Sequence, residues 1–172
     1  AQKFNLDFNV PDFFKVPDPL IQKNFARIMS LKDGTNKMSK SDPSDLSRIN
    51  LTDNKDEIVN KIRKAKTDTQ PLPNNEKDLA NRPEALNLLG IYSSLSNQSL
   101  QNSINEFSGK NFSEFKKNLT ELVVEKITPI SSEINKLQKD NNFIDNILKT
   151  GGEKAEAIAS KKVHEMKKII GF

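Results

Sequence analysis

The sequence contains no cysteine and no tryptophan, and its 172 residues include one histidine and one tyrosine. Without cysteine the chain can form neither a disulfide nor a thiolate metal site, which suits a reducing compartment. The single histidine, His164, argues against a metal site built from several histidines and against a Ser-His hydrolase. These absences remove much of the common catalytic chemistry.

Long apolar stretches are absent as well. No run approaches the roughly 20 residues that a helix needs to cross a bilayer. The opening residues, "AQKFNLDFNV", lack the basic start and apolar core of a signal peptide. Lys and Arg number 27 against 23 Asp and Glu, a net charge of +4 that permits a polyanionic partner without requiring one.

The chain changes character near residue 50. The part before it is rich in proline and holds one short apolar run, Ile28 to Leu31, which a "KDG" turn signal closes. An extended segment needs neighbours for its backbone hydrogen bonds, and no second convincing strand follows. Either this run is not a strand, or its sheet partners lie outside the chain; we favour the second interpretation.

After residue 50 the spacing of apolar residues is helical. Asn54, with Glu57 three residues later, predicts a capped helix over residues 54–66. Pro83 suits the first position of another helix, and Gly109 suits the left-handed end of a short one. The longest pattern covers residues 113–138 and should bend at Pro129.

The last part of the chain predicts two further helices. Asn142 is expected to cap a short helix, and "TGGE" (150–153) is expected to open a separate final one. The apolar residues expected to face inward on the final helix are Ala155, Ile158, Ala159, Val163, Met166, Ile169 and Ile170. Five or six helices with short connections predict a helical bundle.

The stretch "NKMSKSDPS" (36–44) carries the most chemistry. Lys37 and Lys40 are compact cations on long stems with three donors each, and Ser39 and Ser41 add hydroxyl groups. Phosphoryl and adenylyl transfer need preorganised cations because charge builds on the leaving oxygens. The alternative is an ordinary solvated loop in a chain rich in Lys, Ser and Asn.

The residues around this loop give two further expectations. Gly34 should provide a flexible entry and Pro43 a stiff exit, so that the loop can close over a nucleotide and open again. The basic residues of the 54–66 helix should form a solvated surface, with tRNA phosphates as the alternative partner. They are Lys61, Arg63, Lys64 and Lys66.

"KMSKS" (37–41) matches, letter for letter, the signature loop of class I aminoacyl-tRNA synthetases. Other segments are similar to the tryptophanyl-tRNA synthetases, in order and with that family's spacing. They are "ARIMSL", "SKSDP", "DEIVNKIRKAKTD", "LNLLGIYSSLS", "FSGK" and "GGEKAEAIASKKVHEMKKIIGF". The chain resembles this family over nearly its whole length, whereas the tyrosine-specific relatives share the loop and diverge downstream.

The resemblance implies a mainly α fold. Residues 1–50 would be the end of a Rossmann-type α/β catalytic domain, with its last strand and the KMSKS loop. Residues 51–172 would form a helical bundle that binds the tRNA anticodon. The family's His-x-Gly-His signature cannot occur in a chain whose only histidine is His164. We therefore expect the C-terminal half of the enzyme, inactive by itself.

The resemblance also implies an activity and its residues. The family activates tryptophan with ATP, releases pyrophosphate and passes tryptophan to tRNA(Trp). Lys37 and Lys40 would be the catalytic cations. The expected nucleotide contacts are Ile28, through its backbone, and Lys37, Met38, Ser39, Lys40 and Ser41.

Further partners follow from the resemblance. Mg²⁺ would arrive with ATP and need no protein ligand from this chain, and the full-length enzyme would be a homodimer in a bacterial-type cytoplasm or an organelle matrix. Two alternatives stay open: a non-enzymatic helical binding module with a basic surface loop, and the related tyrosyl-tRNA synthetase.

Overall fold

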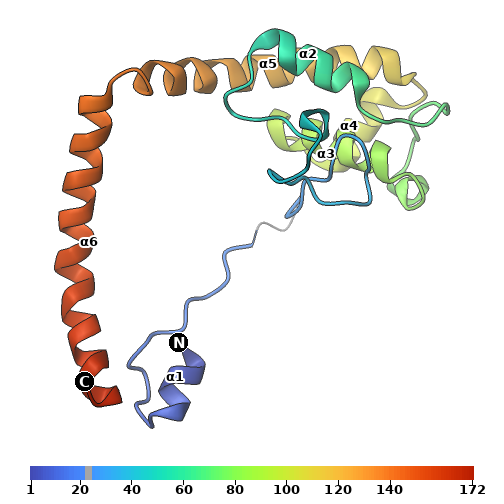
Figure 1. Ribbon diagram of the computed structural model, residues 1–172. Coiled ribbons are helices and arrows are strands. Elements are labelled where there is room, and N and C mark those ends of the chain that lie inside the picture. Colours follow the sequence, from blue (N-terminus) through green and yellow to red (C-terminus); the bar gives the residue numbers. More distant parts are fainter. Residues whose placement is uncertain (22–24) are drawn as a thin grey trace. The chain divides into compact units, whose positions relative to one another are not determined.

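The computed structural model describes residues 1–21 and 25–172, and this part of the chain is mainly helical (Figure 1), which confirms the predicted fold class. The helices are α1 (Gln2–Asp7), α2 (Lys55–Lys64), α3 (Pro83–Ser96), α4 (Leu100–Phe107), α5 (Phe112–Leu137) and α6 (Asn141–Ile170). Two short 3-10 helices, η1 (Asp45–Ser47) and η2 (Glu76–Leu79), lie between them. None of these helices is long and apolar enough to cross a membrane.

The chain divides into two compact units. The smaller unit combines residues 1–21 with residues 137–172, and the larger unit comprises residues 22–136. The segment "NKMSKSDPS" (36–44), called the lysine loop from here on, belongs to the larger unit. The boundary expected at residue 50, between a catalytic remnant (1–50) and a helical domain (51–172), stays a prediction.

Three predicted helix ends are confirmed. The Asn54 side chain accepts the amide of Glu57 at 3.0 Å, and the Glu57 carboxylate accepts the amide of Asn54 at 2.7 Å, so that α2 begins with a capping box. Pro83 is the first residue of α3. Gly109 follows α4 with a φ of 73°, a left-handed conformation that glycine adopts without strain.

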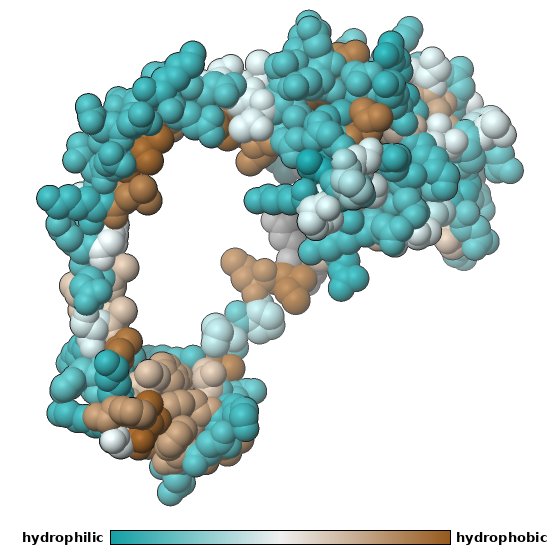
Figure 2. Space-filling view, in the orientation of Figure 1, coloured by the Kyte–Doolittle hydropathy of each residue, from teal (hydrophilic) through white to brown (hydrophobic). Residues whose placement is uncertain are grey.

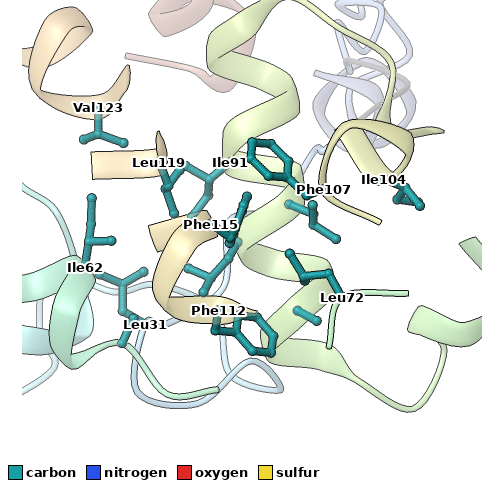
Figure 3. Packing of buried hydrophobic residues seen from close by; sticks show 14 of the residues in the cluster. Leu31, Ile62, Leu72, Ile91, Ile104, Phe107, Phe112, Phe115, Leu119 and Val123 are labelled. Carbon is teal, nitrogen blue, oxygen red and sulfur yellow. The ribbon is translucent and has the colours of Figure 1, made fainter. Parts of the chain in front are cut away.

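The core of the larger unit is assembled from α2, α3, α4 and α5 (Figure 3). The Phe107 ring meets the rings of Tyr92 and Phe115 edge to face, with centroids 4.8 Å apart in both pairs. Such pairs add about 0.5–1.5 kcal/mol to the burial of the rings themselves. Fully buried aliphatic side chains surround them: Ile58, Ile62, Leu79, Leu88, Leu89, Ile104, Leu119 and Val123.

The smaller unit contains a cluster of aromatic rings. Phe4 of α1 lies 4.7 to 5.5 Å, between centroids, from the rings of Phe8, Phe13 and Phe14. The ammonium of Lys162, on α6, stands 3.7 Å from the centre of the Phe13 ring in cation–π geometry. Figure 2 shows the apolar surface that gathers beside α1.

The end of the chain differs from the prediction. α6 is one continuous helix capped by Asp140, whose carboxylate accepts the amide of Phe143 at 2.9 Å, so the predicted cap at Asn142 and break at residues 150–153 are wrong. A glycine inside a helix costs only about 1 kcal/mol relative to alanine, which is too little to interrupt a long helix. The predicted inward face of the final helix is also wrong over its first half, because Ala155, Ile158, Ala159 and Val163 are exposed, whereas Met166, Ile169 and Ile170 are partly buried.

The segment predicted as a strand is extended but forms no strand ladder in the described part of the chain. Met29 makes one isolated antiparallel bridge with Lys37. A longer ladder would need a further neighbouring strand, and the described residues beside this segment are helical or irregular. Pro129 lies inside α5, and the bend expected there stays a prediction.

Candidate functional site

Backbone hydrogen bonds pair the extended segment that leads into the lysine loop with the first residues of that loop. Met29 bridges Lys37, and the amide of Met38 donates to the carbonyl of Ile28 at 3.0 Å. This pairing brings Ile28 beside the loop, although eight or more residues separate it from the lysines in sequence. Lys37 therefore occupies a fixed position along the extended segment.

The turn between the two paired segments is closed by Asp33. Its carboxylate accepts the Thr35 amide at 3.0 Å, the Thr35 hydroxyl at 2.6 Å and the Asn36 side-chain amide at 2.6 Å. The hydrogen bonds from Thr35 are the main reason that the pKa of Asp33 is lowered. The turn is therefore ordered by an ionised aspartate.

Gly34 packs tightly against the start of α3. A Cβ atom at this position would stand 2.6 Å from the carbonyl carbon of Pro83 and from the amide nitrogen of Glu84. Gly34 is also buried. Its role in this structure is close backbone approach, and the expectation that it forms a flexible entry is not supported by this packing.

A buried amide takes the place of a neighbouring strand. The Asn87 side chain, on α3 and 2% exposed, accepts the Met29 amide and donates to the Met29 carbonyl, both at 2.8 Å. These bonds satisfy two backbone groups that a sheet would otherwise pair. Sequence patterns alone did not predict this role for Asn87, whose only signal is a polar residue on the apolar face of a helix.

Phe25 anchors the start of the same extended segment. Its ring lies against Gly90 of α3, where a Cβ atom would stand only 1.3 Å from the ring. Any side chain at position 90 would displace the ring. Asn87 and Gly90, one turn apart on α3, thus both hold the arm that carries Ile28.

An open cleft of about 650 Å³ lies beside the lysine loop. Five of the six predicted site residues line it: Ile28, Lys37, Met38, Ser39 and Lys40. Arg27 and Arg48 add two further cations to its wall. Ser41 is not part of the lining, but its hydroxyl lies 2.9 Å from that of Ser39.

The two lysines of the loop are available to an anion. Both are exposed, and in the described part of the chain no carboxylate lies within salt-bridge distance of either ammonium. Met38, between them in sequence, is partly buried and packs against the core. The loop thus has an apolar anchor at Met38 and presents a cation close to it on each side.

Lys61 is one of the buried residues of α2. Its ammonium lies 2.6 Å from Oδ2 of Asp53 and 2.7 Å from Oδ2 of Asp45, and its side chain is 3% exposed. Burial alone would lower the pKa of Lys61, but hydrogen bonds and charge attraction from the two aspartates outweigh burial and raise it. The expectation that Lys61 belongs to a solvated basic surface is therefore wrong, because Lys61 lies on the same face of α2 as Ile58 and Ile62.

No group of three or more His, Asp or Glu side chains among the described residues is arranged to hold a metal ion. The cleft is lined by four cations, Arg27, Lys37, Lys40 and Arg48. Its chemistry suits an anionic ligand such as a phosphate ester.

Comparison with protein families supports this interpretation. A family model described as tRNA synthetases class I (W and Y) matches residues 1–128. Tryptophan–tRNA ligase of Caulobacter vibrioides is 50% identical over 172 residues, which cover 100% of this chain and 50% of the relative. The ligase of Agrobacterium fabrum is 47% identical over 190 residues and is covered to 54%. The chain spans about half the length of the curated relatives it matches.

Solved structures match as well. Tryptophanyl-tRNA synthetase from Mycoplasma pneumoniae superposes with a TM-score of 0.80 at 28% identity, covering 100% of this chain and 51% of that one. The Campylobacter jejuni enzyme complexed with ADP and tryptophan gives a TM-score of 0.66 at 23% identity, again over 100% of this chain and 51% of that one. The second likeness concerns the fold alone.

Proposed function

The chain belongs to the class I tRNA synthetases for tryptophan and tyrosine, and on that premise we propose that it is the C-terminal half of a tryptophan–tRNA ligase. The whole enzyme would join tryptophan to ATP, giving tryptophanyl-adenylate and pyrophosphate, and then transfer tryptophan to the 3′ end of tRNA(Trp). The observation that carries the proposal is the exposed cleft that Lys37 and Lys40 line together.

Lys37 and Lys40 would act on the triphosphate. When the tryptophan carboxylate attacks the α-phosphorus, the bond to the bridging oxygen breaks and its electron pair leaves with pyrophosphate. The leaving oxygens become more negative in the transition state than they are in ATP. A positioned ammonium is therefore worth more in the transition state than in the bound substrate, which is the condition for a faster step.

The other predicted residues would hold the nucleotide. The backbone at Ile28 would meet the adenine ring, and Met38 and Ser39 would lie along the nucleotide on the cleft wall. Ser41 would support the loop through its contact with the Ser39 hydroxyl. Mg²⁺ would be carried by the ATP phosphates, and we assign it no protein ligand in this chain.

We propose further partners for the whole enzyme. Residues 51–172 would form the part that binds the tRNA anticodon, and residues 1–50 would complete the catalytic domain. A homodimer and a bacterial-type cytoplasmic location are proposed with them. Tryptophan is preferred to tyrosine as the substrate because the relatives at 45–50% identity are tryptophan–tRNA ligases.

The test is ATP–pyrophosphate exchange by the full-length protein that carries this chain, with tryptophan and with tyrosine as the amino acid. We expect exchange with tryptophan only, and none from the 172-residue chain alone. Exchange with tyrosine alone would establish the tyrosine-specific alternative. No exchange with either amino acid would favour a binding module, and robust exchange by this chain alone would disprove the division into two halves.

A further inference from the structure

Arg48 holds the arm that leads out of the lysine loop. Its Nη1 donates to the carbonyl of Asp42 at 3.0 Å and to that of Ser44 at 3.4 Å. Its Nη2 pairs with Asp45 at 3.1 Å, and its Nε donates to Asn50 at 3.1 Å. Asp42 follows directly after the last residue of "KMSKS", so Arg48 fixes the backbone two residues beyond Lys40.

Four acceptors therefore surround a guanidinium that has five N–H donors. The Arg48 side chain is 18% exposed although it lines the cleft. With most of its donors already engaged by the protein, Arg48 has little left for a ligand. Lys37 and Lys40, which also line the cleft, have no such carboxylate partners in the described part of the chain.

The partners of Arg48 are themselves fixed to α2. Asn50 donates its side-chain amide to Asp45 at 3.1 Å and to Asp53 at 3.0 Å. The buried ammonium of Lys61 joins both aspartates, at 2.7 and 2.6 Å. A continuous set of charge-assisted bonds thus runs from the core of the helical unit through Arg48 to the backbone of the loop.

This arrangement determines where Lys40 can reach. The loop has one apolar anchor at Met38. Beyond Lys40, the Asp42 carbonyl accepts from Arg48, whereas the Ser44 carbonyl also accepts from the amide and hydroxyl of Ser47 at 3.1 and 2.7 Å, so loss of Arg48 would release the backbone mainly at Asp42. A planar guanidinium fork fixes two carbonyls and a carboxylate in one geometry, which a lysine cannot do. Misplacement of a catalytic group by about 1 Å can cost on the order of 10²-fold in rate.

We propose that Arg48 is a positioning residue of the lysine loop, which it ties to the buried Lys61, Asp45 and Asp53 so that Lys40 stands over the cleft. The catalytic part of this proposal rests on the proposed function. Its structural part, that Arg48 orders the loop, does not. Two experiments address the two parts separately.

The first experiment measures amide hydrogen exchange in the 172-residue chain and uses Arg82 as a matched control. Arg82 is 13% exposed and also pairs with a carboxylate and a backbone carbonyl: its Nη2 and Nε lie 2.7 and 2.9 Å from Asp68, and its Nη1 donates to the carbonyl of Pro71 at 2.8 Å. It lies outside the lysine-loop cleft. Arg82→Gln therefore removes an equivalent set of bonds elsewhere in the same unit.

Arg48→Gln should speed exchange across residues 37–44 by about tenfold or more, and Arg48→Lys should have an intermediate effect. Arg82→Gln should leave those amides unchanged. Faster exchange over α3 as well would show that a variant has unfolded. If Arg48→Gln unfolds, the exchange of residues 37–44 in Arg48→Lys tests the proposal instead. The proposal would be overturned if the amides of residues 37–44 exchange no faster in the Arg48 variants than in Arg82→Gln.

The second experiment is a double-mutant cycle on kcat for tryptophan-dependent exchange in the full-length protein. Arg48→Gln should lower kcat roughly 10-fold to 10²-fold, with little change in the KM for ATP. In a Lys40→Ala background the same change should add almost nothing, because there is no Lys40 left to position. Additive losses would mean that Arg48 touches the phosphates itself and would overturn the positioning role. If the parent protein shows no exchange, the proposed function fails and hydrogen exchange alone decides the role of Arg48.

Discussion

The lysine loop and the ion pairs of Lys61 with Asp45 and Asp53 use lysine in opposite ways. In the loop, Lys37 and Lys40 are exposed and have no carboxylate at salt-bridge distance among the described residues. In α2, Lys61 is buried and pairs with Asp45 and Asp53. A buried cation needs an anionic partner, whereas an exposed cation is stabilised by water and stays free to bind a ligand. Burial therefore separates the structural lysine from the two that we propose to be catalytic.

The largest effect that would sharpen this comparison is on stability. Lys61→Met should lower the free energy of unfolding by about 3–5 kcal/mol, because it leaves a buried aspartate without its counter-charge. Lys37→Ala and Lys40→Ala should change it by less than about 0.5 kcal/mol, because both side chains are exposed. Urea unfolding followed through Tyr92, the only tyrosine and a residue of α3, measures all three variants.

A second substitution tests whether charge imbalance is the reason. Lys61→Met combined with Asp53→Asn should recover part of the lost stability, since no isolated buried charge remains at that pair. If Lys61→Met lowers the free energy of unfolding no more than Lys37→Ala does, the contrast between buried and exposed lysines is contradicted.

A smaller loss of stability is expected from removing the side-chain amides that bind backbone groups, Asn87 in the larger unit and Asn5 in the smaller one. Asn87→Leu would leave the amide and carbonyl of partly buried Met29 without their partner, a side chain that is only 2% exposed, at a cost of about 1–3 kcal/mol. Asn5 makes the same pair of bonds to Phe14, at 3.0 and 2.9 Å, in a partly buried place. Asn5→Leu should cost less because water can reach the released groups, and a larger loss in Asn5→Leu would contradict this account of the two amides.

The mildest prediction concerns the hydroxyl of Tyr92, a partly buried residue that packs against the core. Burial, followed by the hydrogen bond to Glu106 at 2.9 Å, raises the pKa of Tyr92 to about 12. A raised pKa means that its contribution to stability is complete below pH ~10, the unfolded value, and is lost as the pH rises toward about 12. Because the chain has no tryptophan and no other tyrosine, tyrosinate absorbance reports this group alone.

The check is a titration of the folded and the urea-unfolded chain. The folded chain should titrate near the raised pKa and the unfolded chain near pH ~10. Glu106→Gln should lower the folded value part of the way, since burial remains. Coincident titrations of the folded and unfolded chain would show that neither burial nor Glu106 acts on the Tyr92 hydroxyl.

Local sequence signals predicted those features that depend on local chemistry. The Asn54–Glu57 capping box, Pro83 at a helix start and the left-handed Gly109 each follow from backbone groups within a few residues. The loop was likewise recognisable because "KMSKS" is contiguous. Its pairing with Ile28 and the resulting cleft followed only from the folded chain.

The features that the sequence did not predict depend on contacts distant in sequence. Lys61 pairs with residues 8 and 16 positions earlier, which turns an apparent surface lysine into a buried one. Asn87 bonds a residue 58 positions away. Gly151 and Gly152 marked a helix start by composition, yet they lie inside α6 because the rest of that helix outweighs their low propensity.

We propose that Lys37 and Lys40 act in catalysis because of their position, and not because of positive charge alone. The most direct measurement is kcat for tryptophan-dependent ATP–pyrophosphate exchange in the full-length protein with Lys40→Ala, set against Lys32→Ala. Lys32 is equally exposed, precedes the loop and lies outside the cleft lining. The account predicts a loss on the order of 10²-fold for Lys40→Ala, partial rescue by Lys40→Arg, and no loss for Lys32→Ala. Equal rates in both alanine variants would contradict it.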